Sequence, residues 1–237
     1  MSTNPVPFWA VVPAAGAGRR MGSATPKQYL EIHGRAVLHH TVARLAAQPG
    51  LRGIVIAVDA ADDRFDALAA DLPGPVHRVT GGAERADSVL AALDHLAGHA
   101  AADDWVLVHD AARPCLRTGD LDHLLTTLAE EPVGGLLGIP VVDTVKHADT
   151  DGVVDATVDR SGLWRALTPQ MFRLGPLRTA LGEALAAGVP VTDEASAVEW
   201  AGHRPRMVEG SADNVKITRP EDLALAALYL GHQQETA

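Results

Sequence analysis

The feature that most constrains this chain is an alternation between short, continuously apolar runs and stretches with helical periodicity. Apolar runs at 8–12, 53–58 and 105–108 have almost no polar interruption, and weaker runs follow at 136–139 and 207–208. Runs that are continuous rather than alternating are typical of strands covered on both faces of a mostly parallel sheet. We therefore expect these five segments to be strands.

Helical signals occupy the intervals between these runs. Apolar residues from Ala86 to Ala97 recur at helical spacing and form one stripe on one helix face. Thr218 and Glu221 have the spacing of a capping box, with Pro220 in the first turn, and Thr192 marks another helix start. Strands that alternate with helices predict a doubly wound α/β fold.

One segment, 141–160, breaks the alternation. Its short β-prone pieces at 141–142, 153–154 and 157–158 flank a turn at 149–152 that is rich in Asp and Gly. The segment has too little apolar mass for a core of its own. We expect a projecting β-arm of the kind that a second subunit completes.

Length and composition bound the remaining possibilities. The 237 residues can bury a full core, and we expect one domain, 1–237, with the arm inside it. No run approaches the roughly 18 apolar residues that cross a bilayer, and no signal-peptide pattern is evident, so we expect a cytoplasmic protein without membrane contact. The single cysteine, Cys115, excludes an intramolecular disulfide, and a net charge of −10 disfavours nucleic-acid binding.

The loop after the first run is basic inside an acidic chain. Residues 1–30 hold Arg19, Arg20 and Lys27 but no Asp or Glu. Glycines at the carboxyl end of a strand let backbone N–H groups approach phosphate oxygens, and arginine adds a charged fork that pairs with phosphate. The segment 13–27 therefore predicts a phosphate site, with chance and solubility as the alternative.

Two familiar phosphate-binding motifs fit this loop poorly. A dinucleotide fingerprint needs G-x-G-x-x-G, but after Gly16 and Gly18 the third glycine comes one place late, at Gly22. A Walker A loop needs Lys after its last glycine, where this chain has Arg19. The loop is thus a phosphate-binding turn of neither form.

Nine sequence blocks resemble the 2-C-methyl-D-erythritol 4-phosphate cytidylyltransferase family. The first reads P-A-A-G-x-G-x-R-M and the second P-K-Q-Y, and a later one reads H-D-A-A-R-P. Each block is weak alone, but their ordered combination is highly specific. The blocks cover nearly the whole chain, at 13–21, 26–29, 81–88, 108–114, 143–146, 158–164, 167–170, 192–196 and 213–222.

The resemblance implies a fold of the Rossmann-like nucleotidyltransferase type and a reaction that joins CTP to a polyol phosphate with release of pyrophosphate. Negative charge builds up during in-line attack on the α-phosphate, so the reaction needs positioned cations more than a covalent nucleophile. By resemblance Arg20 and Lys27 stabilise that charge, although solvated surface charge is the usual fate of such residues. The resemblance assigns the triphosphate to Ala14, Ala15, Gly16, Gly18 and Arg19.

The resemblance also assigns the base and a metal ion. Asp110 ends a buried run, and a carboxylate there suits Mg²⁺, a cation that shares its ligands with phosphates. Asp110 could instead cap the following turn. Gly82, Ser88 and Ala111 match CTP-binding positions, with a first-turn helix hydroxyl as the alternative for Ser88. Ala83 departs from the commonest family pattern, which has an acidic residue there, and leaves open a weaker affinity for CTP.

The remaining matched positions imply the site of the polyol phosphate. By resemblance this site comprises Arg113, Thr144, Arg160, Thr168 and Lys216. Arg160 lies at the end of the predicted arm, so we expect it to enter the active site of a neighbouring subunit in a homodimer. An interface or intrachain ion pair is the alternative for this arginine.

Three rival functions remain at this point. A ribitol-5-phosphate cytidylyltransferase shares the loop and the metal site, and Arg160 with Lys216 favours methylerythritol phosphate without settling the choice. A dinucleotide-dependent oxidoreductase is disfavoured by the displaced third glycine. A catalytically dead nucleotide-binding regulator is disfavoured because Arg20, Lys27 and Asp110 are all retained.

Overall fold

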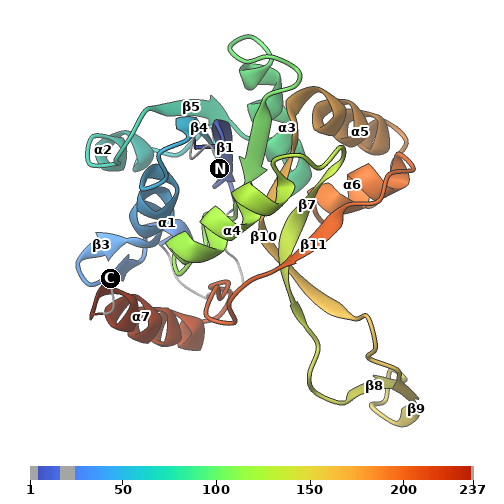
Figure 1. Ribbon diagram of the computed structural model, residues 1–237. Helices are drawn as coiled ribbons and strands as arrows, with labels where there is room; N and C mark the ends of the chain where they lie inside the picture. Colours follow the sequence, from blue (N-terminus) through green and yellow to red (C-terminus); the bar gives the residue numbers. More distant parts are fainter. Residues whose placement is uncertain (1–4, 17–24, 236–237) are drawn as a thin grey trace.

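A computed structural model describes residues 5–16 and 25–235 and contains a seven-stranded sheet with the order β11-β7-β10-β6-β1-β4-β5 (Figure 1). Neighbouring strands are parallel except around β10, which is antiparallel to both β6 and β7. The strands are β1 (Phe8–Pro13), β4 (Leu51–Val58), β5 (Val76–Thr80), β6 (Trp105–Val108), β7 (Gly134–Pro140), β10 (Trp164–Arg173) and β11 (Arg206–Glu209). The expected mostly parallel sheet is confirmed.

Helices cover both faces of this sheet (Figure 1). Val12 packs into an apolar cluster with residues of α1 and α4, whereas its neighbour Val11 packs with residues of α3 and α5 on the other face. This alternation along one strand confirms a doubly wound fold. The helical elements are α1 (Val37–Ala46), α2 (Phe65–Ala69), α3 (Arg85–Leu96), α4 (Thr118–Leu128), α5 (Leu174–Ala186), α6 (Glu194–Trp200), α7 (Pro220–Glu235) and the short η2 (Lys27–Tyr29), and a small ribbon joins β2 (Glu31–Ile32) to β3 (Arg35–Ala36).

All five expected strands are present, but the sheet also contains two that the apolar runs did not reveal, β5 and β10. The β10 sequence includes Thr168-Pro169 in its middle, and proline is unusual in a central strand because it donates no ladder hydrogen bond. The pairing of β10 with β7 shifts register between Ala166 and Gln170, which places the proline where the ladder is already interrupted.

Two helix starts differ from expectation by one residue. Asp222 rather than Glu221 makes the cap of α7, where its carboxylate accepts hydrogen bonds from the backbone N–H and hydroxyl of Thr218, each at 2.8 Å. At α6 the capping residue is Asp193 rather than Thr192, with Ser196 N donating to Asp193 Oδ1 at 3.0 Å. At α6 the carboxylate accepts from a backbone donor of the first turn, whereas at α7 it reaches back to backbone donors of Thr218 and Arg219, which precede the helix.

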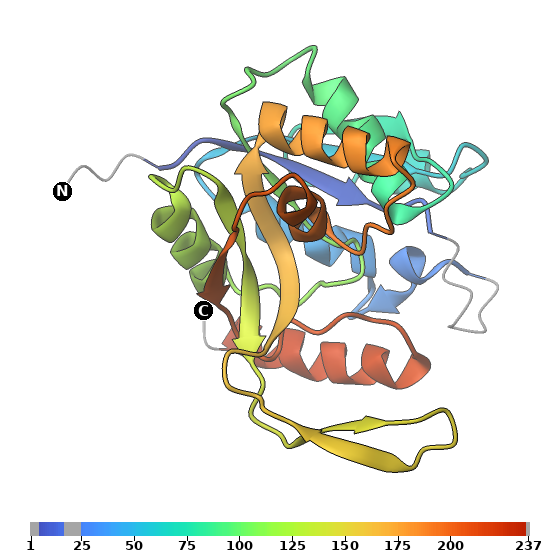
Figure 2. The same ribbon diagram turned by 90° about the vertical axis from the view of Figure 1, so that its right-hand side faces the viewer.

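The segment 141–160 forms the expected projecting hairpin, in which β8 (Val145–Ala148) pairs antiparallel with β9 (Val154–Val158). Figures 1 and 2 show it set apart from the central sheet. The expectation that 141–142 forms part of a strand is wrong, because β8 begins at Val145 and the Val142 side chain is exposed. The arm leaves from the end of β7 and returns at the start of β10, which is the carboxyl edge of the parallel strands.

No helix among residues 5–16 and 25–235 combines the length and the apolar character that crossing a membrane requires.

Candidate active site

The carboxyl edge of the sheet carries a cleft of about 260 Å³. Open α/β sheets collect ligands at this edge, outside the ends of the parallel strands. Charged and polar side chains dominate the lining, which consists of Arg85, Asp110, Arg113, Ala166, Leu167, Thr168, Gln170, Thr192, Asp193 and Lys216. Four residues expected to bind substrate or metal, Asp110, Arg113, Thr168 and Lys216, therefore meet in one place.

Asp110 is the centre of this cleft. It lies just after β6, and its side chain is only 8% exposed. Three cations converge on it: Arg85 Nε lies 2.9 Å from Oδ1, and Lys216 Nζ and Arg113 Nε lie 2.9 and 3.4 Å from Oδ2. The carboxylate is thus held by side chains from three separate parts of the sequence.

These cations determine the charge state of Asp110. Burial alone would raise the pKa of its carboxyl, but Arg85, Lys216 and Arg113 outweigh burial and hold the pKa well below its usual range. The neighbouring His109 behaves differently, because complete burial lowers its pKa to about 4. At neutral pH the site therefore contains an ionised aspartate beside an uncharged histidine.

Thr168 and Asn214 anchor the walls of the cleft to each other. The backbone N–H of Asp110 donates to Thr168 Oγ1 at 3.1 Å, and the same hydroxyl lies 2.9 Å from His109 Nδ1. Asn214 Nδ2 donates to the Thr168 carbonyl at 2.8 Å, and Arg113 Nη1 donates to the Asn214 carbonyl at 2.7 Å. Because these groups are buried and hydrogen-bonded to one another, the cleft has a defined shape before any ligand binds.

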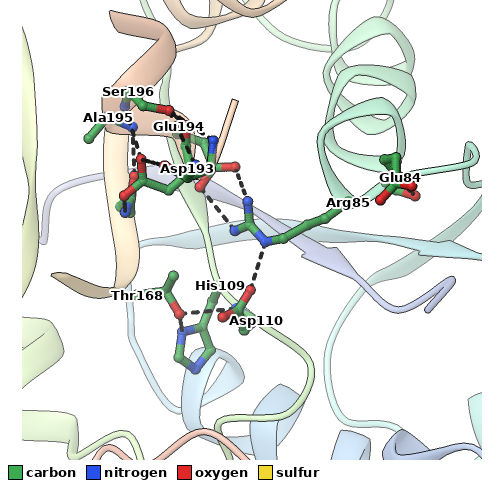
Figure 3. A network of polar contacts seen from close by, with 12 residues as sticks. Glu84, Arg85, His109, Asp110, Thr168, Asp193, Glu194, Ala195 and Ser196 are labelled. Carbon is green, nitrogen blue, oxygen red and sulfur yellow. Dashed lines mark hydrogen bonds and ion pairs between the residues drawn. The ribbon is translucent and has the colours of Figure 1, made fainter. Parts of the chain in front are cut away.

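Arg85 and Glu194 are site residues that sequence reasoning missed (Figure 3). Nη1 and Nη2 of Arg85 donate to the two carboxylate oxygens of Glu194 at 2.7 and 3.1 Å, while its Nε faces Asp110. Burial alone would lower the pKa of the guanidinium, but Glu194 and Asp110 raise it above its ordinary value. Both residues lie inside the matched blocks 81–88 and 192–196, so their presence there was the available signal.

The expected cytosine-binding residues lie together at the start of α3. Gly82 N donates to Ser88 Oγ at 3.1 Å, and the same hydroxyl donates to the Glu84 carbonyl at 3.1 Å. Ser88 is therefore both a first-turn helix hydroxyl and a support for the Gly82 backbone. A Cβ on Gly82 would lie 2.3 Å from the Asp87 side chain, so this position requires glycine.

The loop after β1 is described only in part. Ala14 is buried and hydrogen-bonded, with its N–H donating to the Ala57 carbonyl at 2.7 Å and its carbonyl accepting from Gln28 Nε2 at 2.8 Å. Ala15 and Gly16 continue from there to the surface. The predictions for Gly18, Arg19 and Arg20 fall outside the described residues.

Lys27 and Lys216 come from opposite ends of the sequence, and of the two only Lys216 lines the cleft. Lys27 Nζ donates to the Ile217 carbonyl at 3.1 Å, and Ile217 N donates to the Ala112 carbonyl at 2.8 Å. The segment that carries Lys216 is thereby held between Lys27 and the residues after Asp110. Ala111 is buried beside this contact.

Two of the five residues expected at the polyol phosphate do not line the cleft of their own chain. Thr144 is exposed and precedes β8, and Arg160 is exposed and donates to the Val142 carbonyl at the base of the arm. Neither lines the cleft that contains Asp110. Within one chain, the expected polyol-phosphate site is therefore divided between the sheet edge and the arm.

The side chains of the cleft fit a metal ion that shares its ligands with bound phosphates, but not one held by protein groups alone. Among the described residues there is no group of three or more His, Cys, Asp or Glu side chains that could hold one. Mg²⁺ in phosphate-transfer sites is commonly bound by one or two carboxylates, with phosphate oxygens and water completing its ligands. Asp110, a buried and ionised carboxylate that faces the cleft, fits that shared mode and does not fit an all-protein cage.

Comparisons with known proteins all give the same family. A family model described as 2-C-methyl-D-erythritol 4-phosphate cytidylyltransferase matches residues 8–232. Relatives with the same name include one from Ectopseudomonas mendocina (strain ymp), 59% identical over 225 residues that cover 94% of each chain. Another, from Pseudomonas aeruginosa (strain UCBPP-PA14), is 56% identical over 225 residues, which cover 94% of this chain and 96% of that protein.

Solved structures show the same similarity. A crystal structure of 4-diphosphocytidyl-2C-methyl-D-erythritol synthase matches with a TM-score of 0.83 and 38% identity, covering 94% of this chain and 98% of the other. The 2-C-methyl-D-erythritol 4-phosphate cytidylyltransferase of Francisella tularensis matches with a TM-score of 0.77 and 32% identity, covering 94% of this chain and 99% of the other. The likeness therefore extends through the sheet and the segments that carry the cleft.

Proposed function

The chain belongs to the 2-C-methyl-D-erythritol 4-phosphate cytidylyltransferase family, and on that premise we propose that the cleft around Asp110 is where the reaction takes place. The enzyme transfers CMP from CTP to 2-C-methyl-D-erythritol 4-phosphate, which gives 4-diphosphocytidyl-2-C-methyl-D-erythritol and pyrophosphate. The observation that supports this location is the convergence of Arg85, Arg113 and Lys216 on one buried carboxylate at the carboxyl edge of the sheet.

The proposed chemistry is in-line displacement at the α-phosphate of CTP. A phosphate oxygen of the polyol forms the new P–O bond, and the bond to the pyrophosphate leaving group breaks. Negative charge grows on the reacting phosphate, and Lys27 together with Arg20 stabilises it from the loop that follows β1. The backbone from Ala14 to Arg19 holds the triphosphate, and Gly82 with Ser88 contacts the base.

Mg²⁺ is the proposed cofactor, and Asp110 with the phosphates of CTP would hold it. When bound, the ion supplies charge neutralisation for the triphosphate and polarises its oxygens. Arg113, Thr168 and Lys216 contact the polyol phosphate from the wall of the cleft. Lys216 is paired with Asp110 at 2.9 Å in this structure, so this cation is already held in place when an anionic substrate binds.

We further propose that the active unit is a cytoplasmic homodimer in which the arm 141–160 supplies Thr144 and Arg160 to the partner's cleft. Two features support this: neither residue lines the cleft of its own chain, and the arm carries exposed apolar side chains. An exposed valine-rich hairpin without a core of its own is stabilised when a second chain covers it.

Pyrophosphate release from CTP and Mg²⁺, with each polyol phosphate supplied separately, tests the substrate assignment. We expect turnover with methylerythritol phosphate and none with ribitol 5-phosphate. Turnover with ribitol 5-phosphate alone would contradict the assignment, and binding of CTP without turnover of either acceptor would indicate a nucleotide-binding regulator. A Lys27→Ala preparation is the control for contaminating activity.

A further inference from the structure

Arg85 presents two different edges of its guanidinium to two carboxylates (Figure 3). Its Nε donates to Asp110 Oδ1 at 2.9 Å, whereas Nη1 and Nη2 donate to Oε1 and Oε2 of Glu194 at 2.7 and 3.1 Å. The paired Nη end is a part of arginine that binds a carboxylate with two parallel hydrogen bonds. Glu194, whose side chain is 1% exposed, therefore occupies a strong carboxylate-binding edge of this arginine.

We propose that Glu194 is a positioning residue that determines how Asp110 is offered to a divalent cation. By occupying the Nη end of Arg85, it restricts this arginine to a single hydrogen bond with Asp110. In the absence of the Glu194 charge, the Nη end would turn to Asp110, the nearest remaining carboxylate, and engage both of its oxygens. This inference rests on the proposed metal role of Asp110.

The other contacts of Asp110 leave room for a cation. A carboxylate oxygen has two acceptor positions, so Oδ1 retains one after it accepts from Arg85 Nε. Oδ2 is paired with Lys216, whose side chain is 36% exposed, and has only a long 3.4 Å contact with Arg113. A change in the Arg85 contact from one hydrogen bond to two would remove the availability that this arrangement provides.

The backbone around Glu194 holds it rigidly enough for this role. Gln170, a buried residue of β10, binds both sides of Glu194: its Nε2 donates to Asp193 Oδ2 at 2.8 Å, and its Oε1 accepts from Ala195 N at 2.8 Å. Glu194 is thus fixed to the strand that also carries Thr168. A second carboxylate held in this way can keep a guanidinium in one orientation.

Binding of Mn²⁺ to the enzyme in the presence of CTP, without polyol phosphate, measures the effect apart from turnover. Electron paramagnetic resonance of free Mn²⁺ gives the dissociation constant for wild type and Glu194→Gln. We expect Glu194→Gln to weaken Mn²⁺ binding by roughly 10- to 100-fold, the usual consequence of changing a residue behind a metal ligand. Glu131→Gln is the matched control, because Glu131 also pairs with an arginine, Arg206, but does so at the opposite edge of the sheet. It should leave Mn²⁺ binding unchanged.

A double-mutant cycle separates positioning from a general structural effect. In an Arg85→Gln background, Glu194→Gln should have no further effect on Mn²⁺ binding, because the arginine through which it acts is gone. If Glu194→Gln does not fold, Glu194→Asp keeps the charge on a shorter side chain and should show a smaller loss in the same direction.

Three results would count against the inference. Unchanged Mn²⁺ binding in a folded Glu194→Gln enzyme, even with a lower melting temperature, would show that the residue is structural only. Equal effects of Glu194→Gln with and without Arg85 would show that it does not act through that arginine. An Asp110→Asn enzyme with normal Mn²⁺ binding would overturn the metal role itself. Loss of binding in Asp110→Asn but not in Glu194→Gln would overturn the inference alone.

Discussion

The cleft at the sheet edge and the projecting arm differ in which side chains they bury. In the cleft, charged side chains are buried and paired within one chain, as Asp110 is with Arg85 and Lys216. In the arm, apolar side chains are exposed, with Val142 at 74% and Val154 at 56% exposure. The buried charges of the cleft and the exposed valines of the arm are each the reverse of what an isolated soluble element favours.

This contrast indicates which role each of the two regions has. A buried ion cluster tolerates little rearrangement because each charge depends on its partners, so the cleft is suited to holding reacting groups in place. An exposed apolar hairpin has its stabilising surface still to be covered, so the arm is suited to association. We expect changes in the cleft to affect catalysis and folding, and changes in the arm to affect acceptor binding and assembly.

The largest expected effect comes from Lys27→Ala, beside the segment that carries Lys216 into the cleft. The lysine acts on charge that grows in the transition state, so kcat should fall by roughly 100- to 1,000-fold while the KM for methylerythritol phosphate changes little. Steady-state pyrophosphate release measures both constants. A fall in kcat/KM caused by KM alone would mean that Lys27 only binds substrate, and the contrast between catalytic cleft and binding arm would be lost.

Arg160→Ala tests the arm and should act mainly on KM. Loss of a charge-assisted contact with phosphate should raise the KM for the polyol phosphate by roughly 10- to 100-fold. Lys146→Ala, which removes another exposed cation of the same arm, is the control and should leave that KM close to the wild-type value. An unchanged KM in a dimeric Arg160→Ala enzyme would remove the arm from the active site.

The pH dependence of the free energy of unfolding should reflect the burial of His109 beside Asp110. Because the pKa of His109 is about 4 in the folded protein and about 6.5 in the unfolded chain, the unfolded state binds a proton first as the pH falls. The free energy of unfolding should therefore fall by up to about 1.4 kcal/mol per pH unit between pH 6.5 and 4.

Urea unfolding at several pH values measures this slope. His109→Gln should flatten it. A slope that is the same in wild type and His109→Gln would mean that His109 is not the source. Asp110 acts in the same direction but at lower pH. Its depressed pKa contributes stability at neutral pH, and this contribution is lost only below the ordinary pKa of an aspartate.

The smallest effect is expected from a matched pair of Val→Thr substitutions. At Val55, fully buried in β4, a hydroxyl loses hydrogen bonds to water and should cost about 1–3 kcal/mol of unfolding free energy. At Val154, exposed in β9, the cost should stay within about 0.5 kcal/mol, but the dimer should dissociate more readily. Sedimentation equilibrium measures the dissociation, and unchanged dimerisation in Val154→Thr would count against the arm as an interface.

Sequence patterns predicted the parts of this molecule that depend on local chemistry. Continuous apolar runs identified the parallel strands that are buried on both faces, but not the parallel edge strand β5, which is only partly buried. The region 141–160 was recognisable because it lacked such a run. Strand β10 was missed because Pro169 and Gln170 lie in its middle, and their tolerance depends on a register shift with a strand about 30 residues earlier in the sequence.

The electrostatics of the cleft were less accessible from sequence. Asp110 and Lys216 were predicted separately, yet nothing in their separate motifs indicates that they form an ion pair. The pairing of Arg85 with Glu194 joins residues 109 positions apart, so it depends on the completed fold. Single residues could be singled out from the sequence one at a time, whereas their mutual positioning could not.

Subunit mixing tests most directly the central claim that each cleft is completed by the arm of a second chain. Lys27→Ala and Arg160→Ala subunits, carrying different tags, are coexpressed and their heterodimers isolated. If Arg160 acts in trans, one of the two sites in each heterodimer contains both Lys27 and Arg160, and activity measured well below the KM for methylerythritol phosphate should recover to about half of wild type. If both residues act within one chain, every site in the heterodimer lacks one of them. Activity no higher than that of the parent variants would then contradict the account.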